Sequence, residues 1–186
     1  MGFGTLFATV AFFVIMATGA FLFTSNIMYT AEVVSTSLDA SSDLQNARLK
    51  TDIDIVNISN TSFIPGNATR GINVSIENTG SMKILNSDFE YMDVFIMCDL
   101  GERKRIRHTD NATPKNNEWT GEVNGSCDSI NPGIFDPDEQ MNIAIKVDPE
   151  MKASSSEGAN WVKVVTSNGV SAYEYFNLSN GSVWRG

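Results

Sequence analysis

The chain has 186 residues, a formal net charge of −9 at pH 7 and a sequence pI of about 4.5. An acidic chain is repelled by nucleic acid and by anionic lipid headgroups, which excludes nucleic-acid binding as its function. Every charged residue lies after position 31, where Glu32 is the first. The first 31 residues are therefore uncharged, and the rest of the chain carries the whole net charge.

Residues 3–29 are almost all apolar or small, and they contain no proline. At about 1.5 Å of rise per residue, twenty or more helical residues cross a hydrocarbon core of about 30 Å. A cleaved secretory signal is the alternative, and residues 17–20 (ATGA) imitate a cleavage site. Such signals begin with basic residues and have apolar regions of about 7–15 residues, so we predict a retained helix. No basic residue precedes the span, so its orientation stays open.

Residues 31–50 lack glycine and proline and carry a loose apolar stripe, which predicts that the helix continues as a stalk. From residue 51 the pattern changes to the two-residue alternation of strands, and Asn168-Gly169 marks a hairpin turn. We therefore expect a helical domain over 1–50 and an antiparallel, immunoglobulin-like β-sandwich over 51–186, α+β by content. The expected strands are 51–59, 71–80, 82–85, 89–98, 104–108, 141–147, 160–167 and 170–178.

Acceptor motifs for N-glycosylation are more frequent than the composition predicts, which indicates an extracellular surface. A polar chain rich in Asn, Ser and Thr is the alternative explanation. The candidate acceptors are Asn57, Asn60, Asn67, Asn73, Asn111, Asn124, Asn177 and Asn180.

The chain contains two cysteines, Cys98 and Cys127. In an oxidising compartment they could form a disulfide, whereas two buried thiols are the other reading. A metal site is not expected, because His108 is the single histidine and no CxxC motif occurs. The acidic turn around Asp136 lacks the spacing of a calcium-binding EF-hand loop.

Motifs for catalysis are missing from the sequence: it has no GxSxG, P-loop or HExxH, so we expect no enzyme and no cofactor.

The basic cluster Arg103, Lys104, Arg105 and Arg107 stands out in an acidic chain. It is either a solvated hairpin or a patch for an acidic partner, and contacts through it would depend on salt. Core or cross-strand packing explains most of the aromatic residues, and Trp184 is the candidate for a partner contact.

Four stretches together resemble proteins of the archaeal motility filament, the archaellum. They are GFGTLFATVAFFVIM at the start, INVSIENTG, NPGIFDPDEQMNIAIKV, and VKVVTSNGVSAYEYF near the end. The likeness is greatest to the small F-type and G-type accessory proteins of that archaellin-like family. It implies a membrane helix and an extracellular sandwich that ties the motility machinery to the surface layer by protein–protein contacts.

A structural filament subunit, archaellin-like or pilin-like, is the alternative function. Its helices would pack together where small residues such as Gly4 and Ala8 let backbones approach. The sequence shows no short basic leader of the kind that filament subunits have, so either the protein is inserted unprocessed or its leader is not included in the sequence. The initial Met1 favours the unprocessed accessory protein. Either function predicts a cell-envelope or extracellular location and a homo- or hetero-oligomer with surface-layer or archaellum proteins.

Overall fold

A computed structural model describes residues 2–62, 70–98, 101–124, 131–147 and 160–176. The chain divides into two compact units, Met1–Gln45 and Asn46–Gly186. The first is helical, and the second holds the strands together with the last turn of the helix. The domain limits expected from the sequence, 1–50 and 51–186, remain predictions.

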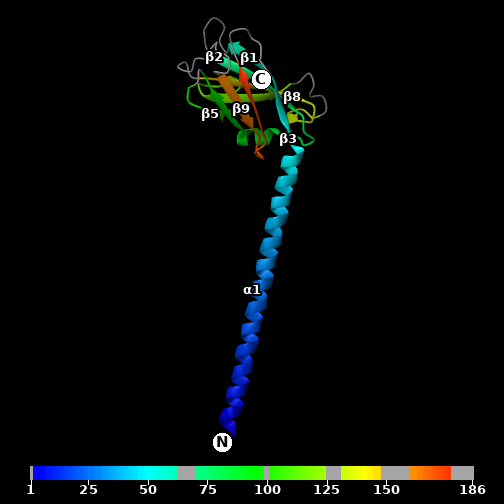
Figure 1. Cartoon of the computed structure of the whole chain (residues 1–186), viewed down its shortest axis with the longest axis vertical. Helices are drawn as coiled ribbons and strands as arrows, with labels where there is room; N and C mark the ends of the chain where they lie inside the picture. Colours follow the sequence, from blue (N-terminus) through cyan, green and yellow to red (C-terminus); the bar gives the residue numbers. More distant parts are fainter. Residues whose placement is uncertain (1, 63–69, 99–100, 125–130, 148–159, 177–186) are drawn as a thin grey trace. The chain divides into compact units, whose positions relative to one another are not determined.

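Helix α1 runs without interruption over Phe3–Lys50 (Figure 1). The absence of proline and the scarcity of glycine allow this length, since either residue weakens a helix interior. Arg48 and Lys50 lie in the last turn, where positive charge is favourable beside the unpaired carbonyl groups. The predicted continuation of the helix over residues 31–50 is therefore confirmed, and its role as a stalk remains a prediction.

The second unit is a β-sandwich in which eight of the described strands are hydrogen-bonded, each to the next, in a single sheet. Among the described residues, eight strands are hydrogen-bonded in the order β1-β2-β8-β6-β5-β4-β9-β10, and β3 pairs separately with β7. The end strands β1 and β10 also lie near each other, so the series folds into two layers. The strands are β1 Ile53–Ser62, β2 Arg70–Asn78, β3 Ile84–Leu85, β4 Asp93–Met97, β5 Lys104–His108, β6 Glu118–Val123, β7 Ile134–Phe135, β8 Gln140–Lys146, β9 Asn160–Val165 and β10 Ser171–Phe176.

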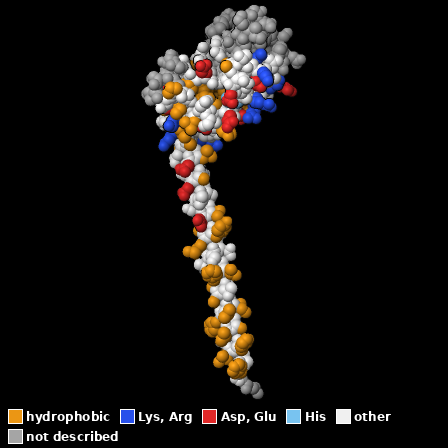
Figure 2. Space-filling model, turned by 180° about the vertical axis from the view of Figure 1, so that it is seen from behind, with side chains coloured by type: hydrophobic (Ala, Val, Ile, Leu, Met, Phe, Trp, Pro, Cys, Tyr) orange, Lys and Arg blue, Asp and Glu red, His pale blue; other side chains and the backbone are white. Residues whose placement is uncertain are grey.

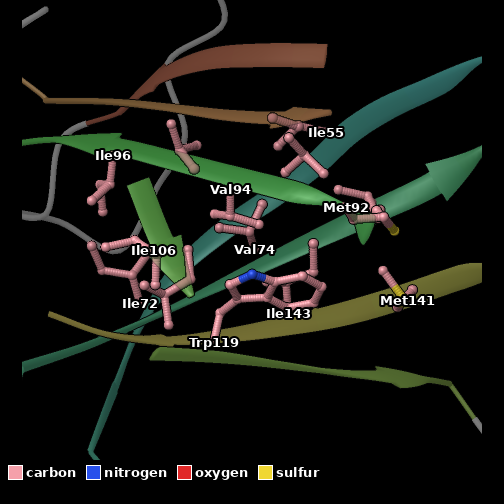
Figure 3. Close-up of a cluster of buried hydrophobic side chains, with 14 of the residues drawn as sticks. Ile55, Ile72, Val74, Met92, Val94, Ile96, Ile106, Trp119, Met141 and Ile143 are labelled. Carbon is pink, nitrogen blue, oxygen red and sulfur yellow. The ribbon is translucent and has the colours of Figure 1, made fainter. Parts of the chain in front are cut away.

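The core lies between the layer β1-β2-β8-β6 and the layer β5-β4-β9-β10. Side chains from the two layers point toward one another, among them Val74, Val94 and Ile143 (Figure 3). In β4, β8 and β9 every second residue is buried, because successive side chains of a strand point to opposite faces of the sheet. Trp119 is the largest fully buried side chain.

Two local expectations are wrong. Residues 89–92 are not strand: Asn86–Tyr91 form a 3₁₀ helix, η1, which buries Phe89 before β4 begins. Strand β6 was not expected, because its sequence EWTGEV has a central glycine and weak alternation. Gly121 leaves room for the core there, since an added Cβ would lie 3.2 Å from the Trp119 ring and 3.3 Å from Met141 Sδ, closer than most such contacts.

The sandwich class predicted from the sequence is confirmed, with one departure from antiparallel order. The short β5–β6 pairing, Arg107 with Glu118 and His108 with Trp119, is parallel. The other described strand pairs are antiparallel. This parallel pairing joins the two layers along one side of the core.

Candidate anchoring and docking sites

The first half of α1 is apolar on every side. Residues 12–16 (FFVIM) are five consecutive apolar residues, and at about 100° per residue they encircle the helix. None of the described helix residues is buried, and Phe7 and Ile15 are 75% and 70% exposed. Figure 2 shows hydrophobic side chains along the first half of α1, and acidic side chains of the helix only in its second half. Such a surface requires an apolar environment in place of water.

The polar side chains within this apolar region are satisfied inside the helix. The hydroxyl groups of Thr9, Thr18, Thr24, Ser25 and Thr30 each donate a hydrogen bond to the carbonyl four residues earlier, at 2.8–2.9 Å. The Asn26 amide does the same at 2.9 Å. A hydroxyl bonded in this way lowers the cost of placing the helix in an apolar medium, where unpaired polar groups cost several kcal/mol.

Gly4 and Ala8 lie one turn apart on α1, and both are exposed. A Cβ added to Gly4 would meet nothing within 4 Å. The position is therefore open to close approach by another helix, and its use for helix packing remains a prediction.

The last turn of α1 is fixed within the second unit by the turn after β2. The Lys50 carbonyl accepts hydrogen bonds from Ser81 N–H at 2.8 Å and Met82 N–H at 3.1 Å. Gly80 N–H donates to the Asp52 carbonyl at 3.1 Å. A Cβ on Gly80 would lie 2.4 Å from Asp52 N and 2.6 Å from Lys50 O, so only glycine fits. We call this set of contacts, residues 46–52 with 78–82, the helix junction.

The side chain of Asn78 stabilises the turn of the helix junction by hydrogen bonds. Its buried side-chain amide donates to the carbonyls of Met82 at 2.9 Å and Phe135 at 3.1 Å, and its Oδ1 accepts from Gly80 N–H at 3.2 Å. The Asn-x-Gly ending of INVSIENTG therefore has a structural role. Asparagine supplies both kinds of hydrogen bond, and glycine admits the close backbone.

The β9–β10 hairpin turn contacts the same end of the helix. Arg48 Nε donates to the Asn168 carbonyl at 2.7 Å, and Asn168 Nδ2 donates to Thr51 Oγ1 at 2.6 Å. Gly169 adopts a φ of +89°, as the predicted Asn-Gly turn requires. The turn thus forms the hairpin and also binds residues 48–51.

The predicted basic cluster divides between two surfaces of β5. Ile106 is buried, so Lys104 shares its side of the strand, whereas Arg105 and Arg107 project outward. Arg105 forms an exposed ion pair with Asp93 at 2.6 Å. The Arg103 guanidinium lies 5.2 Å from the centre of the Trp161 ring, within cation–π range.

A half-open groove of about 690 Å³ runs beside β5. Its polar lining mixes both signs of charge, because it includes Glu90 and Asp110 as well as Arg105 and Arg107. His108 also lines the groove and packs edge-on against the Trp119 ring, 4.6 Å between ring centres. Beside the groove the pKa of Tyr91 is raised by its hydrogen bond with Glu90 and by the charge of that carboxylate.

The candidate glycosylation sites fall in several places. Asn57 is exposed on β1, Asn73 is half-buried on β2, and both lie on the outer face of the β1-β2-β8-β6 layer. Asn111 is exposed after β5, and Asn124 is half-buried after β6. Asn60 is in β1, while Asn67, Asn177 and Asn180 lie outside the described residues. Their use as acceptors remains a prediction.

The cysteines and acidic residues give no further site. Cys98 is buried after β4, and Cys127 lies outside the described residues, so their pairing remains a prediction. Within the described ranges, no group of three His, Cys, Asp or Glu side chains is placed to hold a metal ion. Trp184 also lies outside the described part of the chain.

The described part of the chain is thus a long apolar helix followed by a β-sandwich, and the apolar helix is consistent with membrane anchoring. The sequence profile of the archaeal-type flagellin family matches residues 1–176. The chain belongs to this family, and it is an archaellum-related protein. The family and the archaellum proteins among the structural neighbours are structural components and not enzymes. A comparison with curated protein sequences finds no match.

Solved structures with the same fold include archaeal filament proteins. The archaeal flagellum of Methanospirillum hungatei strain JF1 is similar over 98% of each chain, with 12% identity and a TM-score of 0.60. Flagellin FlaB1 of Methanocaldococcus jannaschii is similar over 73% of this chain and 94% of its own, with 12% identity and a TM-score of 0.52. The archaellum periplasmic stator protein FlaG of Sulfolobus acidocaldarius matches 68% of this chain and 99% of its own, with 17% identity and a TM-score of 0.48.

Proposed function

We propose that this protein is a membrane-anchored accessory component of the archaellum. Its helix lies in the lipid bilayer, and its extracellular sandwich contacts a surface-layer protein and so tethers the motility machinery. The function consists of binding and carries no reaction.

The observation that carries this proposal is the length of the apolar part of α1. Residues 3–23 are apolar or small on all sides, and at about 1.5 Å per residue they extend about 31 Å. This length matches a hydrocarbon core of about 30 Å. The hydroxyl groups bonded within the helix suit the same medium. Beyond residue 31 the helix becomes charged, as a stalk in water requires.

Charge placed inside the predicted span tests the anchor. The double substitution Val14→Lys with Ile15→Lys puts two cations at the centre of the span, at about 2.5–3.5 kcal/mol each on the insertion scale. We expect this variant to leave the membrane fraction. Val33→Lys with Val34→Lys is the matched control in the stalk, and it should remain in the membrane. Equal retention of both variants would contradict the anchor.

A filament subunit is the second candidate, favoured by the family match and by the small residues Gly4 and Ala8 on the exposed helix. Mechanical shearing of cells separates the two functions, because it removes filaments and leaves membrane proteins behind. An accessory protein stays in the sheared cells. Recovery of the chain as a main constituent of the shed filaments would establish the filament subunit instead.

A further inference from the structure

The outer face of the β5-β4-β9-β10 layer combines aromatic and basic side chains. Strand register aligns Phe95 with Lys163 and Met97 with Trp161 across β4 and β9. On β10, Tyr173 lies opposite Lys163, and Tyr175 lies opposite Trp161. The buried partners alternate with these residues, so all of them project from one surface. The aromatic–basic face is Asp93, Phe95, Met97, Arg103, Arg105, Arg107, Trp161, Lys163, Tyr173 and Tyr175.

The composition of the aromatic–basic face is that of a protein interface. Tyr173 and Tyr175, on the end strand β10, are 61% and 47% exposed. Tyr, Trp, Arg and Met are enriched in interfaces, and Trp, Tyr and Arg contribute most of the binding energy where they occur. The sequence shows the arginine cluster, but only the strand register brings it together with these aromatic residues.

The charge of the face is opposite to that of the rest of the chain. Four basic residues and one acidic residue give the face a formal charge of 4 − 1 = +3. The whole chain carries −9, so the remainder carries −9 − 3 = −12. A cationic face on an anionic protein selects partners with complementary, acidic surfaces and repels basic ones.

The opposite outer face has a different character. On β2 and β8 it presents Ser75 hydrogen-bonded to Asn142 at 2.7 Å, with Glu77 opposite Gln140. The acceptor motifs at Asn57 and Asn73 also lie on that polar face. None of the four strands of the aromatic–basic face contains such a motif. One outer face is therefore suited to water and glycan, and the other to contact with protein.

The ring geometry favours a protein over a carbohydrate as the partner. Tyr173 and Tyr175 are perpendicular to each other, with ring centres 6.4 Å apart, so they form no flat platform for successive sugar rings. The Arg103 guanidinium covers one side of the Trp161 ring. Tyr, Trp and Arg are the residue types that most often anchor protein–protein interfaces.

We propose that the aromatic–basic face is the docking surface for an acidic protein of the cell envelope. The inference rests on the proposed tether function and adds which side of the sandwich binds and which charge the partner carries. Arg107 and Lys163 meet carboxylates of the partner, and the two tyrosines pack against its apolar groups.

Binding of the full-length chain in detergent to isolated surface layer tests the proposal, measured by co-sedimentation. We expect Arg107→Glu to weaken binding roughly tenfold or more, through charge reversal at the interface. Tyr173→Ala with Tyr175→Ala should weaken it by a similar factor. The matched controls are Lys104→Glu, on the same strand but the opposite surface, and Tyr91→Ala, an exposed tyrosine outside the face. Both should bind within about twofold of the unmodified chain.

Each other outcome has a distinct meaning. Surface-layer binding that is unchanged in the Arg107 and tyrosine variants overturns the docking face and leaves the tether function intact. If the chain does not bind the surface layer at all, the tether function is contradicted, and binding to poly-L-glutamate is measured as a test with an acidic probe. Binding to poly-L-glutamate that the Arg107 and tyrosine substitutions weaken supports an acidic partner for the face. Absence of binding to poly-L-glutamate overturns the docking proposal.

Two further measurements exclude other occupants of the face. Salt-sensitive self-association in sedimentation equilibrium, lost with Arg107→Glu, would make a second copy of the chain the occupant and overturn the proposal. Loss of binding after chemical deglycosylation of the surface layer would make glycan the ligand, with the same consequence. Binding that persists after deglycosylation supports a protein surface.

Discussion

Gly80→Ala is expected to loosen the helix junction, because no space exists for a methyl group at this position. The added Cβ would lie 2.4 Å from Asp52 N and 2.6 Å from Lys50 O, both backbone atoms that cannot rotate away. The turn must therefore move as a whole. Its movement breaks three backbone hydrogen bonds, from Gly80 to Asp52 and from Ser81 and Met82 to Lys50.

The size of the effect follows from these bonds. At about 1 kcal/mol net for each hydrogen bond, their loss lowers the free energy of unfolding by roughly 3 kcal/mol. With a urea dependence of about 2 kcal/mol/M, the unfolding midpoint falls by roughly 1.5 M. Urea titration of the full chain in detergent, followed by tryptophan fluorescence, measures this shift.

Gly4→Ala is the matched control, because a Cβ at that glycine meets nothing within 4 Å. Its unfolding midpoint should equal that of the unmodified chain. If Gly80→Ala also left the midpoint unchanged, the close approach of residues 50–52 to this turn would be refuted.

Three further predictions use the same titration. Asn78→Ala leaves two carbonyls without this donor and should lower the free energy of unfolding by about 2–4 kcal/mol; a decrease below about 1 kcal/mol would contradict the role of Asn78 in the helix junction. Trp119→Ala should cost about 3–5 kcal/mol and Trp161→Ala much less, because the first ring is fully buried and the second is only half-buried; equal losses would contradict the core assignment. Arg105→Ala should change stability by less than about 1 kcal/mol, since its ion pair with Asp93 is 67% and 35% exposed; a larger loss would show a structural role.

Elements with strong local signals were predictable from the sequence. The uninterrupted apolar run defines α1, and alternation of apolar residues with polar or small ones defines β2 and β8. Strand β6 and helix η1 were not predictable, because tertiary packing determines both. Trp119 packs beside Gly121, and Phe89 enters the core from the short 3₁₀ helix.

The candidate sites were predictable only in part. The arginine cluster is visible in the sequence, yet its division between two surfaces depends on the burial of Ile106. Its association with Trp161 and the tyrosines depends on the pairing of β4 with β5 and β9. These are contacts between distant parts of the chain, which no local pattern encodes.

Spin labels placed around one turn of the apolar helix measure its surroundings most directly. Single cysteines at Phe12, Phe13, Val14 and Ile15, in a chain with Cys98→Ala and Cys127→Ala, sample all sides of the helix. In membranes, collision with oxygen should be frequent, and collision with a water-soluble nickel complex rare, at all four positions. Oxygen access that falls at positions on one side only would show a helix packed against other helices, and ready access for nickel would show a helix in water. Either result would contradict the lipid anchor.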